Sequence, residues 1–405
     1  MQLMDRHVVD ALLPGLLRFF PRNKWKFLLR ININWAQCLT AFRWGNPLKY
    51  ASLISFTKWI DALDRGVARP YCLEAVHTID FRCLNSSSQI SLNQEARADW
   101  LNVILRTCPS IKHFIAQKFN FLDSETVRQI VIKGYDLKSL DLSNSINLSA
   151  AAIRRLLEIF HSLQELDLRS SNINDALLAE IPHISPQLLS LSLNSNARLS
   201  TDLIASTASK LKCLRHLDIS NIPKIGDRLF HTLLESNTHS LTSLLVRNTS
   251  ITAPGLFAFT QMRGGSITRL DISKTRHLNF DIESLRVVAF TLSNLQSFTF
   301  SFDAFYAIRN YDEPEVIRIL SRMSLTQLTL QDLRQTHVSA TQTISKICEL
   351  CPGLRVTLYR TTGEADYIKE MYTDCEKPVF DVESLQLQFG NRIVVVDVKE
   401  WDDSE

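Results

Sequence analysis

The sequence has few glycines and none of the short motifs that mark common catalytic sites. Only eleven of its 405 residues are glycine, and GxxxxGK[ST], GxGxxG, GxSxG and HExxH are all missing. These motifs supply phosphate-cradling loops, strained serine nucleophiles and zinc ligands. The sequence therefore lacks the usual signatures of nucleotide-binding enzymes, serine hydrolases and zinc proteases. The ten histidines are scattered singly. We therefore expect no catalytic residues, no metal site and no cofactor, and hence a protein that is not an enzyme.

Long apolar runs and a disulfide framework are also missing. The longest apolar stretch, residues 11–20, is interrupted by a Pro-Gly pair and is shorter than a membrane span requires. Asp5 and Asp10 precede it, which is the wrong charge order for a secretion signal. Eight cysteines at uneven spacings are typical of reduced thiols, and the lone pair Cys348 and Cys351 fits one helix face better than a zinc site. We expect a cytoplasmic or nuclear protein, or both, that does not bind membranes.

Charge is unevenly distributed along the chain. The formal net charge is +3, yet residues 1–75 hold eleven Lys/Arg against five Asp/Glu, a balance of +6. Residues 361–405 hold four against twelve, a balance of −8. Such a split can steer partners to different ends of a molecule, or can simply reflect solvated surfaces. Neither end is basic enough to indicate a nucleic-acid partner.

A repeat organises the middle of the chain. The pattern apolar-x-x-apolar-x-apolar begins clearly in "LKSLDLS" at 137 and recurs at 163, 188, 214, 241, 267, 295 and 325. Weaker copies begin at 76, 111 and 354. Most successive starts lie 25 to 28 residues apart. This period is typical of a leucine-rich repeat.

Each repeat encodes one short strand followed by one helix. In "LQELDLR", Leu163, Leu166 and Leu168 would point inward, as alternation in a strand requires. Amphipathic helices are predicted over residues 149–160, 200–211 and 226–236, and Asp175 is placed to cap another. The turn after each strand carries a small polar residue that can bond backbone groups inside the bend; these are Ser145, Ser171, Asn196, Thr249 and Thr275, with Ile222 as the exception.

The pattern predicts an α/β fold, a leucine-rich-repeat solenoid with a curved parallel sheet and helices on its convex side. No single unit can cover its own leucines, so stacked neighbours must bury them. We expect about ten repeats over residues 71–360 after a small all-α head at 1–70. Residues 361–405 would form a C-terminal cap and an acidic tail, in which Val394 to Val398 pairs with the last repeat.

The repeats resemble the cysteine-containing leucine-rich repeats of F-box proteins, which form a ribonuclease-inhibitor-like solenoid. The segments "LQELDLRSSNINDALL" and "LRHLDISNIPKIGDRL" follow that family's pattern LxxLdLsxCxxItDxgL most closely. "CPSIKHF" and "CPGLRV" resemble the Cys-Pro-x-Leu entry to such units. The turn cysteine of the family is replaced here by Ser, Asn or Thr. The resemblance covers residues 76–360.

The head resembles a degenerate F-box. Helical apolar spacing over residues 8–47 indicates a compact three-helix unit. Leu13-Pro14 stands where the family has its Leu-Pro start, Ile31 to Trp35 replaces "V-x-x-W", and "FRWGNP" replaces the later "LW-x-x-P". In the family this unit contacts a Skp-type cullin adaptor. The positions that would contact the adaptor here are Leu13, Pro14, Leu16, Leu17, Phe27, Leu28, Ile31 and Trp35.

The resemblance implies the substrate-recognition subunit of an SCF-type (Skp/cullin/F-box) ubiquitin ligase. The head would bind the adaptor, and the repeats would bind a protein substrate. The alternative is a non-catalytic interaction scaffold of the same fold, whose head only caps the first repeat, because a solenoid needs covered ends in any case.

The residues at outward-facing strand positions form the surface that we expect to contact a protein substrate. From these positions, and from the aromatic segment 295–316 that departs from the unit length, we select Glu165, Asp167, Arg169, His216, Arg247, Arg269, Thr299, Phe302, Phe305 and Gln327. The aromatics fit either an interface or core filling. Arg247 and Arg269, on adjacent strands, would either clamp one anionic group together or pair with Asp218 and Asp271. Asp at 141, 167, 218 and 271 recurs in register, which fits the repeat itself better than a cation site.

Overall fold

The structure is a computed structural model that describes residues 45–46, 53–67, 73–84, 94–118, 122, 124–128, 136–235, 240–278, 280–301, 313–333, 338–361 and 382–398. Its residues fall into two compact units, Met1–Leu188 and Leu189–Glu405. The predicted adaptor-contact residues, from Leu13 to Trp35, lie outside the described residues. Of the expected head, residues 45–46 and 53–67 are described.

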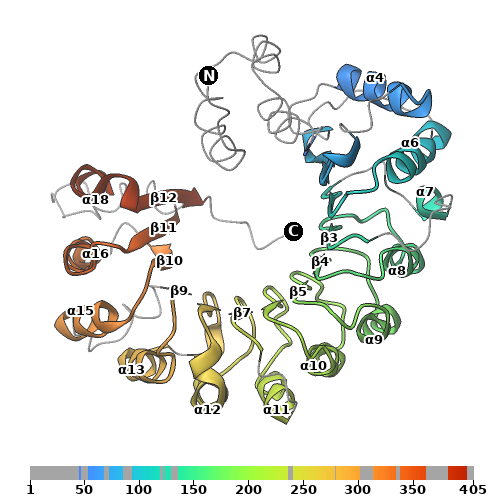
Figure 1. Ribbon diagram of the computed structural model, residues 1–405. Coiled ribbons are helices and arrows are strands. Elements are labelled where there is room, and N and C mark those ends of the chain that lie inside the picture. The colour runs from blue at the N-terminus through green and yellow to red at the C-terminus, as the bar shows by residue number, and fades with distance from the viewer. Residues whose placement is uncertain are drawn as a thin grey trace, which may run out of the picture. The chain divides into compact units, whose positions relative to one another are not determined.

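The first unit alternates parallel strands with helices (Figure 1). Its strands pair in chain order, and its helices lie on the outer side of the strands. The strands are β1 (Thr78–Asp80), β2 (His113–Ile115), β3 (Ser139–Asp141) and β4 (Glu165–Asp167). The helices are α4 (Leu53–Asp64), α6 (Gln94–Thr107), α7 (Ser124–Arg128), α8 (Ala150–Ile159) and α9 (Asp175–Ile184), with a 3-10 turn η2 (Phe81–Leu84).

The second unit repeats this arrangement with parallel strands that again pair in chain order. The strands are β5 (Ser190–Ser192), β6 (His216–Asp218), β7 (Ser243–Leu245), β8 (Arg269–Asp271), β9 (Ser297–Ser301), β10 (Gln327–Leu333), β11 (Arg355–Thr361) and β12 (Ile393–Val398). The helices are α10 (Thr201–Lys210), α11 (Arg228–Glu235), α12 (Ala253–Arg263), α13 (Ile282–Thr291), α15 (Glu313–Arg322), α16 (Val338–Leu350) and α18 (Val382–Phe389), with 3-10 turns η3 (Gly264–Ser266), η4 (Arg276–Leu278) and η5 (Gly390–Arg392). Within this unit the strands line the inner side of a curve and the helices its outer side (Figure 1).

The strands confirm the fold predicted from the repeat. Each of the eleven repeat copies supplies one strand, β1 to β11, and β12 pairs with β11 from Ile393 to Val398, as expected for the C-terminal cap. The leucines predicted to point inward are buried, since Leu163, Leu166 and Leu168 are each at most 2% exposed. No helix in the described part of the chain is long and apolar enough to cross a membrane.

The turn after most strands passes through a left-handed backbone conformation. Positive φ angles near 50–60° recur one repeat apart at Lys118, Asn144, Ser170, Ser195, Asn221, Asn248 and Lys274. The backbone N–H of Asn144 donates to the carbonyl of Arg169, and Asn221 and Asn248 do the same to the next repeat. Asn tolerates this conformation better than most residues, because its short polar side chain bonds locally.

The small polar residues after the left-handed position bond carbonyl groups inside the bend, as predicted. Ser171 Oγ donates to the Leu168 carbonyl at 2.6 Å, Thr249 Oγ1 to Val246 at 2.7 Å, and Asn196 Nδ2 to Leu193 at 2.9 Å. Ser145 and Thr275 reach back to carbonyls of the preceding repeat, at Ala116 and Val246, and Thr275 also bonds the Ser273 carbonyl of its own bend. Ile222 is buried at the same position and makes no such bond. These bonds compensate carbonyls that the sharp turn removes from water.

Helix starts follow the predicted pattern with one correction. Asn174, and not Asp175, is the N-cap of α9, because its side chain accepts a bond from Leu177 N at 3.0 Å. Asp175 is the first helical residue, where its carboxylate interacts favourably with the helix dipole. Ser149 caps α8 as expected for a helix over 149–160.

Adjacent repeats are also braced at their helix starts. Asp227 accepts two bonds from Thr252, one from its backbone N at 2.9 Å and one from its hydroxyl at 2.6 Å. Thr252 is the N-cap of α12. Ser124 and Ser149 form a similar link 25 residues apart in the first unit. Gly255 packs directly against the Asp227 side chain, since a Cβ atom there would lie 2.1 Å from Asp227 Cγ.

The first repeat receives its missing neighbour from the chain just before it. In a typical repeat, two consecutive N–H groups donate to one carbonyl of the preceding repeat, as Lys112 and His113 do to His77. His77 and Thr78 donate in the same way to Gly45, at 3.0 and 2.7 Å. The Gly45 carbonyl therefore accepts the two backbone bonds that a preceding repeat would accept.

We predict that Gly255→Ala destabilises the protein by about 2 kcal/mol. The new methyl group displaces the Asp227 carboxylate and breaks both of its bonds to Thr252. Urea unfolding, with hydrogen exchange at the Thr252 amide as a local readout, measures the effect. Gly265→Ala is the control, because no atom lies within 4 Å of its Cβ position. Equal losses of unfolding free energy in both variants would contradict a stabilising role for the bonds between Asp227 and Thr252.

We predict opposite effects of two substitutions at left-handed positions. Ser170→Gly should stabilise the protein by roughly 0.5–1 kcal/mol, because glycine adopts φ near 47° without steric cost. Asn144→Ala should destabilise it by about 1 kcal/mol, since alanine is strained there. Ser139→Gly, the same exchange as at 170 but in the extended strand β3, should destabilise. The melting temperatures of the three variants test this prediction. A stabilised Ser139→Gly variant would contradict the view that the gain at residue 170 comes from its left-handed backbone.

Candidate protein-binding face

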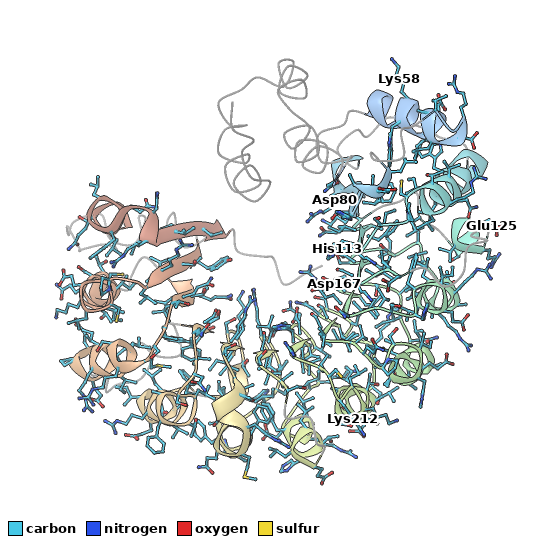
Figure 2. All side chains as sticks on the ribbon, viewed as in Figure 1. Lys58, Asp80, His113, Glu125, Asp167 and Lys212 are labelled. Carbon is cyan, nitrogen blue, oxygen red and sulfur yellow. The ribbon has the colours of Figure 1, made fainter. Side chains whose placement is uncertain are left out.

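Outward-facing residues of neighbouring strands form continuous rows. In the second unit, strand register aligns the third position of each repeat in one row (the outer row): Ser190, His216, Ser243, Arg269, Ser297 and Gln327. The fifth positions form a second row: Ser192, Asp218, Leu245, Asp271, Thr299 and Thr329. In the first unit, Figure 2 shows Asp80, His113 and Asp167 on the inner side of the strands, whereas Glu125 lies outside with the helices.

Three predicted substrate residues share the outer row. His216, Arg269 and Gln327 are exposed and lie on alternate strands, β6, β8 and β10. With strands about 4.8 Å apart, successive members are about 10 Å apart. Ser243 and Ser297 lie between them and leave the larger side chains room to reach outward. Thr299 lies in the second row and is half-buried.

The predicted substrate residues of the first unit form a smaller group on β4. Glu165 is exposed, and Asp167 pairs with Arg169 at 2.7 Å. Burial raises the pKa of Asp167, which the bonds from Arg169 oppose. Asp80 and Arg82 form an identical Asp-x-Arg pair at 2.7 Å, which sequence reasoning missed although the shared spacing could have shown it.

The recurring aspartates belong to the repeat architecture. The carboxylates of Asp141, Asp167, Asp218 and Asp271 each accept a bond from the backbone N–H two residues later, at 2.9 to 3.0 Å. This bond holds the chain as it leaves the strand. Asp271 also accepts the Ser273 hydroxyl, and burial raises its pKa. The architectural interpretation of these residues is thus the correct one.

Of the two alternatives for Arg247 and Arg269, the strand register excludes the shared clamp. Arg269 lies opposite Ser243, so Arg247 projects four residues further along its strand. Four residues correspond to about 13 Å along a strand, too far for both guanidinium groups to bind one carboxylate. Arg247 lies near enough to Asp271 to oppose the rise in the pKa of that carboxyl, and neither arginine forms an ion pair with a described residue.

Phe302 and Phe305 lie outside the described residues, so the choice between interface and core filling for them stays a prediction. Asparagine side chains that sequence reasoning missed form a ladder on the second unit. Asn221 Nδ2 donates to Asn194 Oδ1 at 3.1 Å, and Asn248 Nδ2 donates to Asn221 Oδ1 at 3.2 Å. The ladder ties three successive turns together at the end of the strands.

Three of the described thiols, Cys108, Cys348 and Cys351, are not activated nucleophiles. Burial raises the pKa of the Cys108 thiol to about 11 and also raises those of Cys348 and Cys351. A thiol needs a lowered pKa to react as a nucleophile near neutral pH. No group of three or more potential metal ligands occurs among the residues that the structure describes.

Comparisons with known proteins concern the fold. No protein-family model and no curated protein sequence matches the chain. Among solved structures it is similar to one titled as the crystal structure of the Rad7 and Elc1 complex in yeast, with 17% identity and a TM-score of 0.43, over 60% of this chain and 66%, just under two thirds, of that chain. It is also similar to the leucine-rich-repeat-containing protein LegL7 from Legionella pneumophila, with 16% identity and a TM-score of 0.42, over 71% of this chain and 95% of that chain. The repeat period, the parallel register and the recurring turns of the chain itself make it a leucine-rich-repeat solenoid.

Proposed function

We propose that this protein is a non-catalytic substrate receptor that acts in the cytoplasm or nucleus as the recognition subunit of an SCF-type ubiquitin ligase. Its head would bind a Skp-type adaptor and its outward strand residues a protein substrate. The observation that carries the substrate role is the outer row, in which His216, Arg269 and Gln327 project from a rigid, hydrogen-bonded backbone. A backbone held in this way loses little conformational entropy when a partner binds.

The dimensions of the outer row favour a protein over a small molecule. From β6 to β10 the row crosses four strand spacings, or about 19 Å. Small-molecule sites bring a few polar groups together in a concave pocket. Here the large side chains are spread over alternate strands and separated by serines, which suits a partner that contacts several repeats at once.

The adaptor role is supported by the order of motifs in the sequence. A Leu-Pro start at Leu13, the apolar pair Leu16 and Leu17, and the Trp35 helix precede the repeats in the order found in F-box proteins of this repeat class. An apolar helical face without chemistry of its own is what such a contact requires.

The alternative, a scaffold whose head only caps the solenoid, has an observation in its favour. The Gly45 carbonyl occupies the place of a preceding repeat, and α4 packs beside α6. This part of the chain therefore caps the first repeat. The capping residues follow the predicted adaptor residues in the sequence, so one head can serve both roles.

We predict that Leu16→Asp with Leu17→Asp abolishes co-purification of a Skp-type adaptor with the full chain, because two carboxylates would be desolvated at an apolar contact. Leu387→Asp is the control, since Leu387 is 88% exposed on α18 and should leave binding unchanged. Circular dichroism must show all chains folded. If the adaptor binds neither the parent chain nor the control, the ligase role is contradicted and the scaffold role is favoured.

We predict that replacing His216, Arg269 and Gln327 together by alanine weakens substrate binding at least about tenfold, as for central interface residues. A photo-reactive amino acid at Gln327 of the full chain captures the partner, which is then purified and its Kd measured. The matched control replaces exposed residues of similar type on the helical side, His231, Lys212 and Gln261. Equal Kd values for the two triple variants would exclude the outer row as the substrate site.

A further inference from the structure

The turns that follow strands β5 to β8 carry an excess of basic residues. Residues 194–200, 220–227, 247–252 and 273–278 contain five Lys/Arg and one acidic residue, Asp227. Both carboxylate oxygens of Asp227 are bound by Thr252. We call this surface the basic edge; its described side chains are Arg198, Lys224, Arg247, Lys274 and His277. Of these, all except the half-buried Arg247 are exposed.

The backbone holds the basic edge in a fixed register. Arg198 and Lys224 each lie three residues beyond the left-handed residue of their turn, so they occupy equivalent places in adjacent repeats. Successive turns are joined by backbone bonds, from Ser195 N to Ser220 O at 3.0 Å and from Asn221 N to Arg247 O at 2.8 Å. The asparagine ladder adds side-chain bonds along the same line. Three strand spacings make the edge about 15 Å long.

Arg247 retains unused hydrogen-bonding capacity. Its Nε atom is buried and has no hydrogen-bond partner among the described residues. The carboxylate facing it, Asp271, already accepts the backbone N–H and hydroxyl of Ser273. A half-buried guanidinium group that forms no ion pair with a described residue keeps a charge that can attract a partner's carboxylate.

Several arginines outside the basic edge form ion pairs with aspartates. Arg169 and Arg82 each pair with an aspartate two residues earlier, and Arg228 pairs with Asp202 at 2.8 Å. Arg198 and Lys224 make no ion pair within the part of the chain that the structure describes. The positive charge of these two side chains is therefore available to a partner.

We propose that the basic edge docks an acidic segment of a protein partner, in extended conformation, with one carboxylate held by Arg247 and others by Arg198, Lys224 and Lys274. An extended chain places side chains of one face about 6.6 Å apart, so the edge accommodates two to three acidic residues at alternate positions. The edge lies beyond the strand ends and so adds a second contact surface to the outer row. The inference depends on the second unit alone and holds whether or not the head binds an adaptor.

Fluorescence anisotropy of the full chain with a labelled ten-residue peptide of alternating Glu and Ser tests the proposal. We expect saturable binding at 50 mM salt that weakens strongly at 300 mM, and no binding of the matching Gln-Ser peptide. Two variants should each weaken binding about fivefold or more: Arg198→Gln with Lys224→Gln, both exposed and therefore harmless to folding, and Arg247→Gln.

The matched control is Lys210→Gln with Lys212→Gln, which removes the same charge from exposed residues. Figure 2 places Lys212 on the outer, helical side. The control pair should change affinity less than about twofold. Equal weakening by both pairs would show attraction to overall charge and overturn the proposal, as would equal binding of the Glu and Gln peptides. Neither result bears on adaptor binding, because no adaptor is present.

Discussion

The sharp turn at the end of each short strand is the constraint on which the rest of this fold depends. Most strands contain only three residues, so no repeat has enough backbone bonds to stand alone. A left-handed residue reverses the chain, and its N–H reaches the next repeat. The Ser, Thr or Asn that directly follows it bonds the carbonyls left inside the bend. The turn thus satisfies its own polar groups and fixes the spacing to its neighbour.

The same turn determines which side chains remain for recognition. Aspartates at the fifth strand position are committed to the backbone two residues later and contribute little to an outside partner. At the third position the chain carries the exposed side chains of His216, Arg269 and Gln327. Beyond the turn, Arg198 and Lys224 make no ion pair within the described region. The positions proposed for recognition therefore differ from the positions that hold the turn.

Much of the fold could be predicted from the sequence because the repeat is periodic. The period placed all eleven repeat strands, and the hydroxyl and amide residues of the turns predicted their bonds to carbonyls. What failed depends on distances that periodicity does not contain. Asn174, and not Asp175, is the cap of α9, and the strand register separates Arg247 from Arg269 by four residues. The link of Asp227 to Thr252 joins two repeats across 25 residues and leaves no local signal in either.

The capping of the first repeat changes how the two functional interpretations relate. A solenoid end must be covered, and Gly45 shows that the chain just before the repeats does this with a carbonyl. The motif residues that resemble an F-box, Leu13 to Trp35, precede that point and are not needed for this bond. Capping therefore explains residue 45 and α4 and does not depend on the earlier motif residues. We rank the receptor role above the scaffold role because those earlier residues resemble an F-box in their order along the sequence.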